Sequence, residues 1–293
     1  MNARSTEARH SASTGLHANA SGEVLALALD SQINALNALR PAFPAIEKAA
    51  EAGAAALRSG HKMAYAGAGS SGLMAMADCL ELSGTFGVPV DRTPMLFAGG
   101  AEALLHMRGS VEDDPVLAQD DVERAGLGEG DVLLTVSASG STPYALAAAE
   151  AAQAAGAVVV GIANVPDTLL LATADIPVLI DTGAEIIAGS TRLGAATAQK
   201  AALNLLSVMV GIKLGHVHDG HMVNLVADNA KLVARAARIV GELAQVPPPV
   251  AEAALLATKG AVKSAILVAR GMAPDEASAA LERTEGHLAP LLD

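Results

Sequence analysis

Short apolar runs alternate with alanine-rich stretches of helical spacing through the middle of this chain. Five runs have the length and composition of buried strands: 63–66, 95–98 together with 88–90, 132–136, 158–162 and 176–180. Strands that alternate with helices are typical of βαβ units. The pattern therefore predicts an α/β fold with a doubly wound, mostly parallel five-stranded sheet, which binds ligands at the carboxyl ends of its strands.

Helical patterns flank the predicted sheet on both sides. Two helices are expected before it, over 24–39 and 46–58, and two long apolar helices after it, over 195–214 and 222–243. A proline-rich linker, 245–249, leads to three short helical patterns, too small to hold a large core alone and therefore expected to pack on the main domain. We predict an N-terminal arm with helices (1–60), a sheet domain (61–245) and a small C-terminal helical subdomain (246–293).

Two loops rich in glycine and hydroxyl side chains stand at predicted strand-to-helix junctions, over 67–72 and 137–142. Such a junction presents backbone N–H groups and a helix N-terminus to an anion. We predict that both loops hold the phosphate of one phosphorylated small molecule. The residues expected to contact it are Gly69, Ser70, Ser71, Ser137, Ser139, Ser141 and Thr142.

Other interpretations of these motifs stay open at the level of sequence. The glycines of 67–72 also fit the dinucleotide pattern G-x-G-x-x-G, with Asp91 as its acidic partner, although hydroxyl side chains suit a terminal monophosphate better. The second loop could be a serine-rich N-cap, but a cap needs one hydroxyl and this loop has four. A third polar patch, which could equally be a capped helix start, is formed by Glu185, Ser190, Thr191 and Arg192.

The composition excludes several classes of partner. The formal net charge is −12, and no stretch gathers Lys and Arg into a stripe, so nucleic acid is not expected to bind. No apolar run reaches the roughly 20 residues that span a bilayer, and the first twenty residues do not form a secretory signal. We therefore expect a cytoplasmic protein without a membrane partner. Cys79 is expected to be a buried, inert thiol.

Four segments stand out together along the chain: 67–72, Glu81 followed by Thr85-Phe86-Gly87, Ala98-Gly99-Gly100 leading to Glu112-Asp113-Asp114, and 183–192 with 196–200. In these segments, and over most of its length, the chain resembles the N-acetylmuramic acid 6-phosphate etherases, a family of the sugar isomerase (SIS) fold class. The resemblance implies an enzyme that removes the D-lactyl ether from C3 of a 6-phosphorylated muramic sugar. We expect it to work without a metal or nucleotide cofactor, as a homodimer assembled through the long apolar helices.

The same resemblance places the two catalytic carboxylates on Glu81 and Glu112. Glu112 would take the C2 proton, while Glu81 would protonate the departing lactate and then activate water. Glu185, Ser190, Thr191 and Lys200 would join the phosphate loops in binding the substrate. The apolar neighbours of Glu81 would raise its pKa, and the like charges of Glu112-Asp113-Asp114 would raise at least one pKa among them. Spacing alone instead favours a solvated helix end for Glu81 and an acidic surface turn for Glu112.

The chain departs from the family pattern inside the expected pocket. Leu82-Ser83-Gly84 replaces Cys-Pro-Pro, and Leu73 and Ser141 each replace an arginine. These changes remove positive charge, so the exact phosphosugar stays open, and the candidate cations for its lactyl carboxylate are Arg192, Lys200 and Arg108.

Two other functions, and the role of a histidine cluster, are not decided by the sequence. The alternatives are a non-catalytic sugar-phosphate sensor that regulates a partner and an aldose–ketose isomerase that uses one glutamate. His216, His218 and His221 lie close together in sequence, but without a matching Cys or carboxylate they favour a polar turn over a metal site. A histidine from this turn could also reach a neighbouring subunit's pocket.

Overall fold

The computed structural model describes residues 5–106, 109–227 and 229–292, which form two compact units. The first comprises Met1–Cys79 and Asp91–Ser207, and the second comprises Leu80–Val90 and Val208–Asp293. One boundary between the units falls inside helix α9 (Gly194–Lys213). The two units therefore do not coincide with the three predicted segments, which end at residues 60, 245 and 293.

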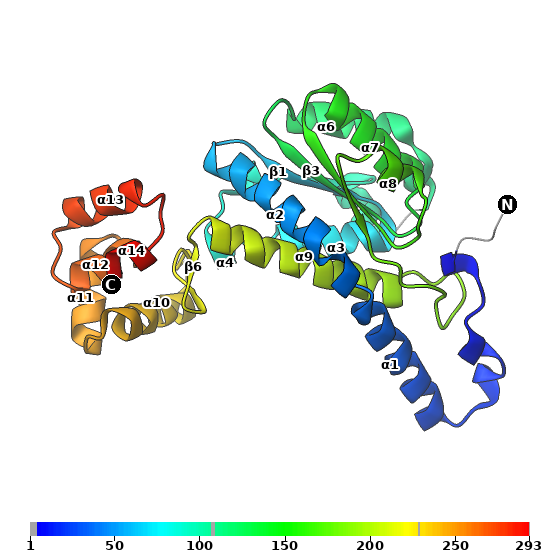
Figure 1. Ribbon diagram of the computed structural model, residues 1–293, viewed down its shortest axis with the longest axis horizontal. Coiled ribbons are helices and arrows are strands. Elements are labelled where there is room, and N and C mark those ends of the chain that lie inside the picture. The colour runs from blue at the N-terminus through cyan, green and yellow to red at the C-terminus, as the bar shows by residue number, and fades with distance from the viewer. Residues whose placement is uncertain (1–4, 107–108, 228, 293) are drawn as a thin grey trace. The chain divides into compact units, whose positions relative to one another are not determined.

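The first unit contains a parallel sheet of five strands, which confirms the predicted fold class (Figure 1). The strands are β1 (Met63–Gly67), β2 (Met95–Phe97), β3 (Val132–Ser137), β4 (Val158–Ala163) and β5 (Ile176–Leu179). Their order is β2-β1-β3-β4-β5, so the direction of winding reverses between β1 and β3. Residues 88–90 are not a strand, because Val90 begins the short helix η5 (Val90–Arg92).

Helices cover both faces of this sheet. The longer ones are α1 (Ser21–Asn37), α2 (Phe43–Arg58), α3 (Gly69–Cys79), α6 (Pro115–Ala125) and α7 (Pro143–Ala154). The shorter ones are η1 (Ser5–Glu7), η2 (Ser11–Ser13), η3 (Leu16–Ala18), η4 (Arg40–Ala42), α5 (Gly100–His106), η6 (Gly109–Asp113) and α8 (Leu169–Thr173). Figure 1 shows α6, α7 and α8 on one face and α2, α3 and the first part of α9 on the other.

The core of this unit is built from small side chains. On the α6–α7 face, Ala64, Leu133 and Val159 of the strands pack against Ala118 of α6 and Tyr144 of α7. Alanine on the helices lets their backbones approach the sheet closely, which explains how an alanine-rich chain with few aromatic residues still fills its core. Over half of the apolar stretch of α9 is buried, and although this helix is long and apolar enough to span a membrane, such burial is typical of a core helix.

The second unit consists of helices and one short hairpin. Its elements are α4 (Glu81–Phe86), β6 (Val217–His218), β7 (His221–Met222), α10 (Ala230–Ala244), α11 (Pro248–Ala257), α12 (Val262–Ala269), α13 (Pro274–Arg283) and α14 (Ala289–Leu292). It has a core of its own, which includes Val223, Ile239 of α10, Leu255 of α11 and Ile266 of α12. The segment 246–293, which the sequence predicts to be too small to hold a large core alone, shares this core with α10 and with Val223 and Leu225 after the hairpin.

His216 makes the stability of this second unit sensitive to pH. Burial, the Lys263 ammonium and His287 lower its pKa to about 4, against a hydrogen bond to the Phe86 carbonyl that raises it. The unfolded chain therefore takes up a proton near pH 6.5 while the folded chain stays neutral, so stability is lost as the pH falls from about 6.5 to 4.

We expect His216→Asn to lose less stability over this range than the wild-type protein. The difference should be on the order of 2 kcal/mol, below the value of the full shift because the ring is partly exposed. Urea unfolding of the full chain between pH 4 and 7 measures it, with the exposed His106→Asn as the control. Parallel pH curves for wild type and His216→Asn would contradict the assignment.

Candidate functional site

The two glycine and serine loops lie side by side at the carboxyl edge of the sheet. The first follows β1 and the second follows β3, and these neighbouring strands pair in parallel with Gly67 opposite Val136. The winding of the sheet reverses between them, which is where open α/β sheets bind their ligands. Ser71 joins the loops directly, since its Oγ accepts a hydrogen bond of 3.3 Å from the Ala138 N–H.

Close packing explains the glycines of the first loop. A Cβ on Gly72 would lie 2.7 Å from the Gly67 carbonyl oxygen and 2.8 Å from a ring carbon of Phe97. Helix α3 therefore begins against β1, with its first turn aimed at the edge of the sheet. Ser70 is partly exposed there, whereas Ser71 is only 8% exposed.

The hydroxyls of the second loop converge on one another. Ser137 and Thr142 are joined by a hydrogen bond of 2.9 Å between their hydroxyl oxygens, and Ser139 Oγ accepts from both the N–H and the hydroxyl of Ser141, at 3.3 and 3.1 Å. Among the described residues, the hydroxyl of Thr142 caps no N–H of α7. The cluster thus exceeds what a helix N-cap requires, and it faces the same edge as Ser71.

Glu112 lies against the first loop. It belongs to η6, and its carboxylate contacts the position that a Cβ would occupy on Gly69, which has a φ of +52°. Burial and the neighbouring Asp113 raise the pKa of Glu112, the direction that makes a carboxylate a stronger general base. The structure therefore places one predicted catalytic residue beside the predicted phosphate loops.

Glu81 is the first residue of α4 and belongs to the second compact unit. Its side chain is exposed, as is that of Leu80, while Leu82 is buried. Leu80 and Leu82 therefore do not bury Glu81, contrary to the expectation that these apolar neighbours would desolvate it.

The third polar patch is a capped helix start, one of its two predicted interpretations. Glu185 is 2% exposed, and its two carboxylate oxygens accept hydrogen bonds of 2.9 and 2.8 Å from the N–H groups of Gly194 and Ala195 at the start of α9. Ser190 and Thr191 lie in the turn before that helix and are partly exposed. Glu185 thus fixes the turn, which leaves the two hydroxyls free to face solvent or a ligand.

Lys200 is already engaged by a buried carboxylate that sequence reasoning missed. Its ammonium lies 3.4 Å from Asp78 Oδ1 and donates to Asn204 at 2.6 Å. Asp78 also accepts from Tyr65 at 3.0 Å and from Ser207 at 3.0 Å, and burial raises its pKa. Three elements meet here, β1, α3 and α9, and because Lys200 of α9 lies 122 residues after Asp78, no local pattern signals this cluster.

The other two candidate cations for the lactyl carboxylate are Arg192 and Arg108. Arg192 is exposed in the turn before α9, whereas Arg108 lies outside the described residues. The dinucleotide alternative loses its acidic partner, because Asp91 is exposed and precedes β2 instead of following it.

The histidine cluster and the cysteine have local explanations. His218 and His221 pair across the β6–β7 hairpin, which confirms the predicted polar turn, and His221 lies 3.3 Å from Glu242. Within the described ranges, no three His, Cys, Asp or Glu side chains are placed to hold a metal ion. Cys79 is buried, donates to the Thr93 carbonyl at 3.1 Å and has a pKa raised to about 12, which confirms an inert thiol.

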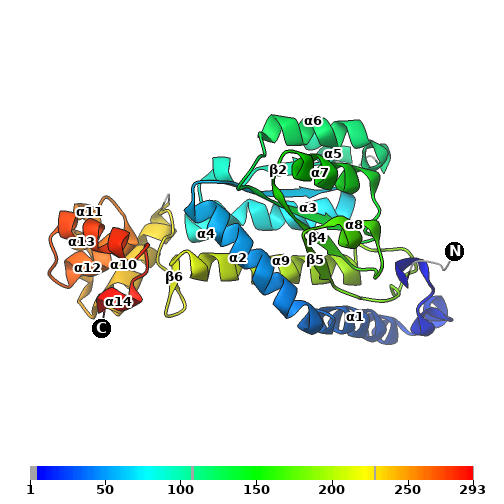
Figure 2. The same ribbon diagram turned by 45° about the horizontal axis from the view of Figure 1, so that its top comes forward.

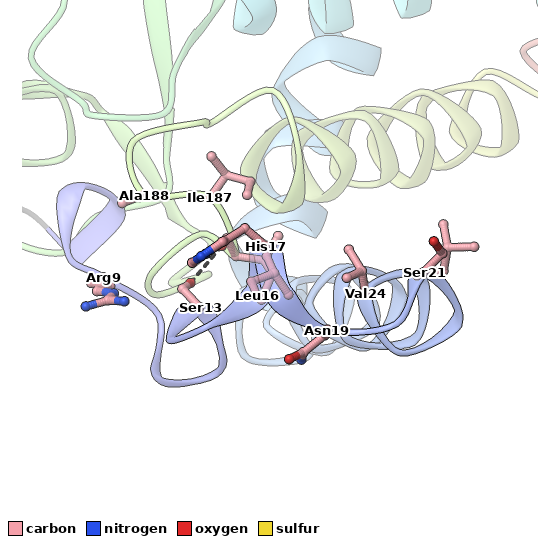
Figure 3. Close-up of a pocket in the computed structure, with 11 residues that line it drawn as sticks. Arg9, Ser13, Leu16, His17, Asn19, Ser21, Val24, Ile187 and Ala188 are labelled. Carbon is pink, nitrogen blue, oxygen red and sulfur yellow. Dashed lines mark hydrogen bonds between the residues drawn. The ribbon is translucent and has the colours of Figure 1, made fainter.

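A large open cavity lies elsewhere, between the N-terminal arm and the loop that precedes α9 (Figure 3). Its volume is about 830 Å³, and neither serine loop lines it. Arg9, His17 and the apolar side chains of Leu16, Val24 and Ile186 form much of its wall. Ser13 fastens the arm to this loop with a hydrogen bond of 2.7 Å to the Ile186 carbonyl.

Comparison with known proteins identifies the family. The SIS domain family matches residues 31–164. N-acetylmuramic acid 6-phosphate etherases of Deinococcus radiodurans and Mycolicibacterium smegmatis are 41% and 37% identical, over 99% and 98% of this chain and 95% and 97% of their own length.

Solved structures agree on the fold. A phosphoheptose isomerase from Francisella tularensis superposes with a TM-score of 0.52 at 21% identity, covering 66% of this chain and all of its own. This likeness concerns the sheet and its helices alone. Together with near full-length identity to the relatives above, it confirms the resemblance seen in the sequence: the chain belongs to the N-acetylmuramic acid 6-phosphate etherase family.

Proposed function

We propose that this protein is a carbon–oxygen lyase that cleaves the D-lactyl ether of N-acetylmuramic acid 6-phosphate, giving N-acetylglucosamine 6-phosphate and D-lactate. The observation that carries the proposal is the contact between Glu112 and Gly69, which sets a carboxylate of raised pKa beside two joined hydroxyl loops. The names of the near full-length relatives support the same reaction. The expected cytoplasmic location stays a prediction.

In this mechanism the phosphate binds to Ser70, Ser71 and the second-loop hydroxyls. The ring-opened aldehyde acidifies the C2 proton, which Glu112 removes, and the C3–O bond then breaks as Glu81 gives its proton to the departing lactate oxygen. Water adds to C3 of the unsaturated aldehyde with Glu81 as base, and Glu112 returns a proton to C2. Both carboxylates end in their starting states, so the net reaction consumes one water.

The lactyl carboxylate needs a cation, and we propose Arg192 for that role. Lys200 is less suited because the carboxylate of Asp78 already neutralises it. Arg192 is exposed in the turn that Glu185 fixes, next to Ser190 and Thr191. Leu73 and Ser141 supply no charge at the two loops, so this pocket relies on hydroxyl and N–H donors for the phosphate.

Proton NMR in deuterated buffer tests the reaction directly. With N-acetylmuramic acid 6-phosphate, we expect release of D-lactate and deuterium at C2 of the product. An isomerase would instead convert a hexose 6-phosphate that carries no lactyl group. Binding without C2 exchange or lactate release would contradict the etherase and leave a phosphosugar sensor.

We also propose that the protein is a homodimer in which α1 is covered by a second copy. Helix α1 extends away from the sheet (Figure 2), and an apolar stripe along it is exposed: Leu25 by 71%, Leu29 by 58%, Ile33 by 45% and Leu36 by 38%. Large apolar residues at such helical spacing are typical of a face that packs against another surface. The open cavity beside Leu25 continues this face.

Leu29→Asp is expected to weaken dimerisation by roughly 100-fold. The change removes a leucine that the proposed dimer would bury and places a charge in its apolar interface. Light scattering after size-exclusion chromatography measures the mass as a function of concentration. Val116→Asp is the matched control, since Val116 is 61% exposed on α6. A wild-type protein that stays monomeric, or a Leu29→Asp variant as dimeric as wild type, would contradict the proposal.

A further inference from the structure

Two buried amide side chains are hydrogen-bonded to each other, and one of them, Asn164, is also bonded through its backbone to the second serine loop. Asn164 follows β4 and Gln199 belongs to α9, and both are 0% exposed. Gln199 Nε2 donates to Asn164 Oδ1 at 2.7 Å. A fully buried amide pair in a sheet-to-helix interface is unusual, because most polar side chains at such depth cost free energy unless every group is bonded.

One atom of the pair is not bonded, which shows how the pair is oriented. Asn164 Nδ2 donates to the Ile180 carbonyl at 3.2 Å, so its Oδ1 must face α9 and needs a donor. Gln199 supplies that donor, and its own Oε1 is left buried without a partner among the described residues. Gln199 is therefore oriented to donate to Asn164 Oδ1, although this orientation leaves its own Oε1 without a hydrogen bond.

Asn164 in turn holds the phosphate loop. Its backbone N–H donates to the Ala138 carbonyl at 3.0 Å, and the Ala138 N–H is bonded by Ser71. Six residues further along, Leu170 N–H donates to the Gly140 carbonyl at 3.1 Å. The second loop thus rests on the segment 164–170, and the Asn164 side chain ties that segment to β5 and α9.

We propose that Gln199 is a positioning residue for phosphosugar binding: through Asn164 it holds the Ala138 backbone and so keeps the Ser137–Thr142 hydroxyls converged on the phosphate. This inference rests on the proposed role of the two loops in phosphate binding, but not on the lyase chemistry. Gln199 itself contacts no substrate. Its removal should weaken binding of any sugar 6-phosphate, with or without a lactyl group.

Gln199→Met tests the proposal, because it keeps the length of the side chain and removes its donor. We expect the Kd for N-acetylglucosamine 6-phosphate, measured by calorimetric titration, to rise at least fivefold. The matched control is Gln153→Met on α7, whose amide donates at 2.9 Å to the Thr173 carbonyl at the other end of the sheet. Unchanged affinity in a folded Gln199→Met protein would overturn the proposal, even if its Tm fell.

Gln199→Glu adds a readout that a purely structural role would not move. An ionised carboxylate repels Asn164 Oδ1, whereas the protonated acid again donates to it, so affinity relative to wild type should recover as the pH falls. This variant also serves if Gln199→Met does not fold. A constant ratio of affinities across pH would overturn the proposal. Lactate release by wild type is scored separately, so tight phosphosugar binding without lactate release refutes the lyase alone.

Discussion

Glu112→Gln is expected to slow the release of D-lactate by about 10²–10⁴-fold, the usual contribution of one general base. Glutamine keeps the size of the side chain and its contact with Gly69, but it cannot take the C2 proton. The product phosphosugar should still bind with near wild-type affinity, since the serine loops are unchanged. The measurement is single-turnover lactate release, with the exposed Glu102→Gln on α5 as the control.

The pH profile links this effect to Glu112 itself. Burial and Asp113 raise its pKa, and a base must be deprotonated, so wild-type activity should fall as the pH drops through that raised value. Asp113→Asn removes one of the two causes and should move this acidic limb to lower pH while leaving the plateau rate unchanged. Two results would refute Glu112 as the base: wild-type turnover by Glu112→Gln, or an acidic limb of the pH–rate profile that lies at the same pH in Asp113→Asn and wild type.

Local patterns were sufficient for the sheet and for the two loops. Strands β1, β3 and β4 are mostly apolar, and every residue in them except Val158 is buried. Glycine and hydroxyl residues directly after β1 and β3 mark the two loops. Because parallel strands end at one edge, two such loops on neighbouring strands must meet there. The hydrogen bond from the Ala138 N–H to Ser71 Oγ confirms that the two loops meet.

The start of α10 differs from the sequence-based expectation, although an Asp-Gly pair marks the hairpin before it. The helix expected over 222–243 begins only at Ala230, because a hairpin precedes it. Asp219 and Gly220 have φ values of +46° and +74°, the conformation that an Asp-Gly pair favours in a two-residue hairpin turn. Apolar spacing alone could not separate the end of this hairpin from the helix that follows.

Other features depend on contacts that no local pattern records. Asp78 meets Lys200 across 122 positions, and the buried amides Asn164 and Gln199 are 35 apart. Each of these side chains taken alone is consistent with a solvated surface position. The family resemblance indicated Glu112 as a catalyst, but only the structure shows that Gly69 provides the space in which its carboxylate lies.

Gly69→Ala is therefore expected to reduce turnover by about 10²-fold, the scale of a misplacement near 1 Å. A methyl group on Gly69 would occupy the position of the Glu112 carboxylate and displace it. Alanine at a φ of +52° also strains the backbone, by about 1 kcal/mol. The control separates these effects: Gly100 has a φ of +59° but no heavy atom within 4 Å of its would-be Cβ, so Gly100→Ala carries the strain without the displacement.

A double-mutant cycle decides whether Gly69 acts through Glu112 or through the phosphate. If the added methyl acts by displacing the carboxylate, Gly69→Ala should cost little further turnover in the Glu112→Gln background, because the two changes disable the same step. If it acts on the phosphate, the losses should multiply and the Kd for N-acetylglucosamine 6-phosphate should rise in both backgrounds. Equal turnover by Gly69→Ala and Gly100→Ala would show that catalysis does not require the Glu112 carboxylate to lie against Gly69. The contact between this loop and the base would then have no role in catalysis.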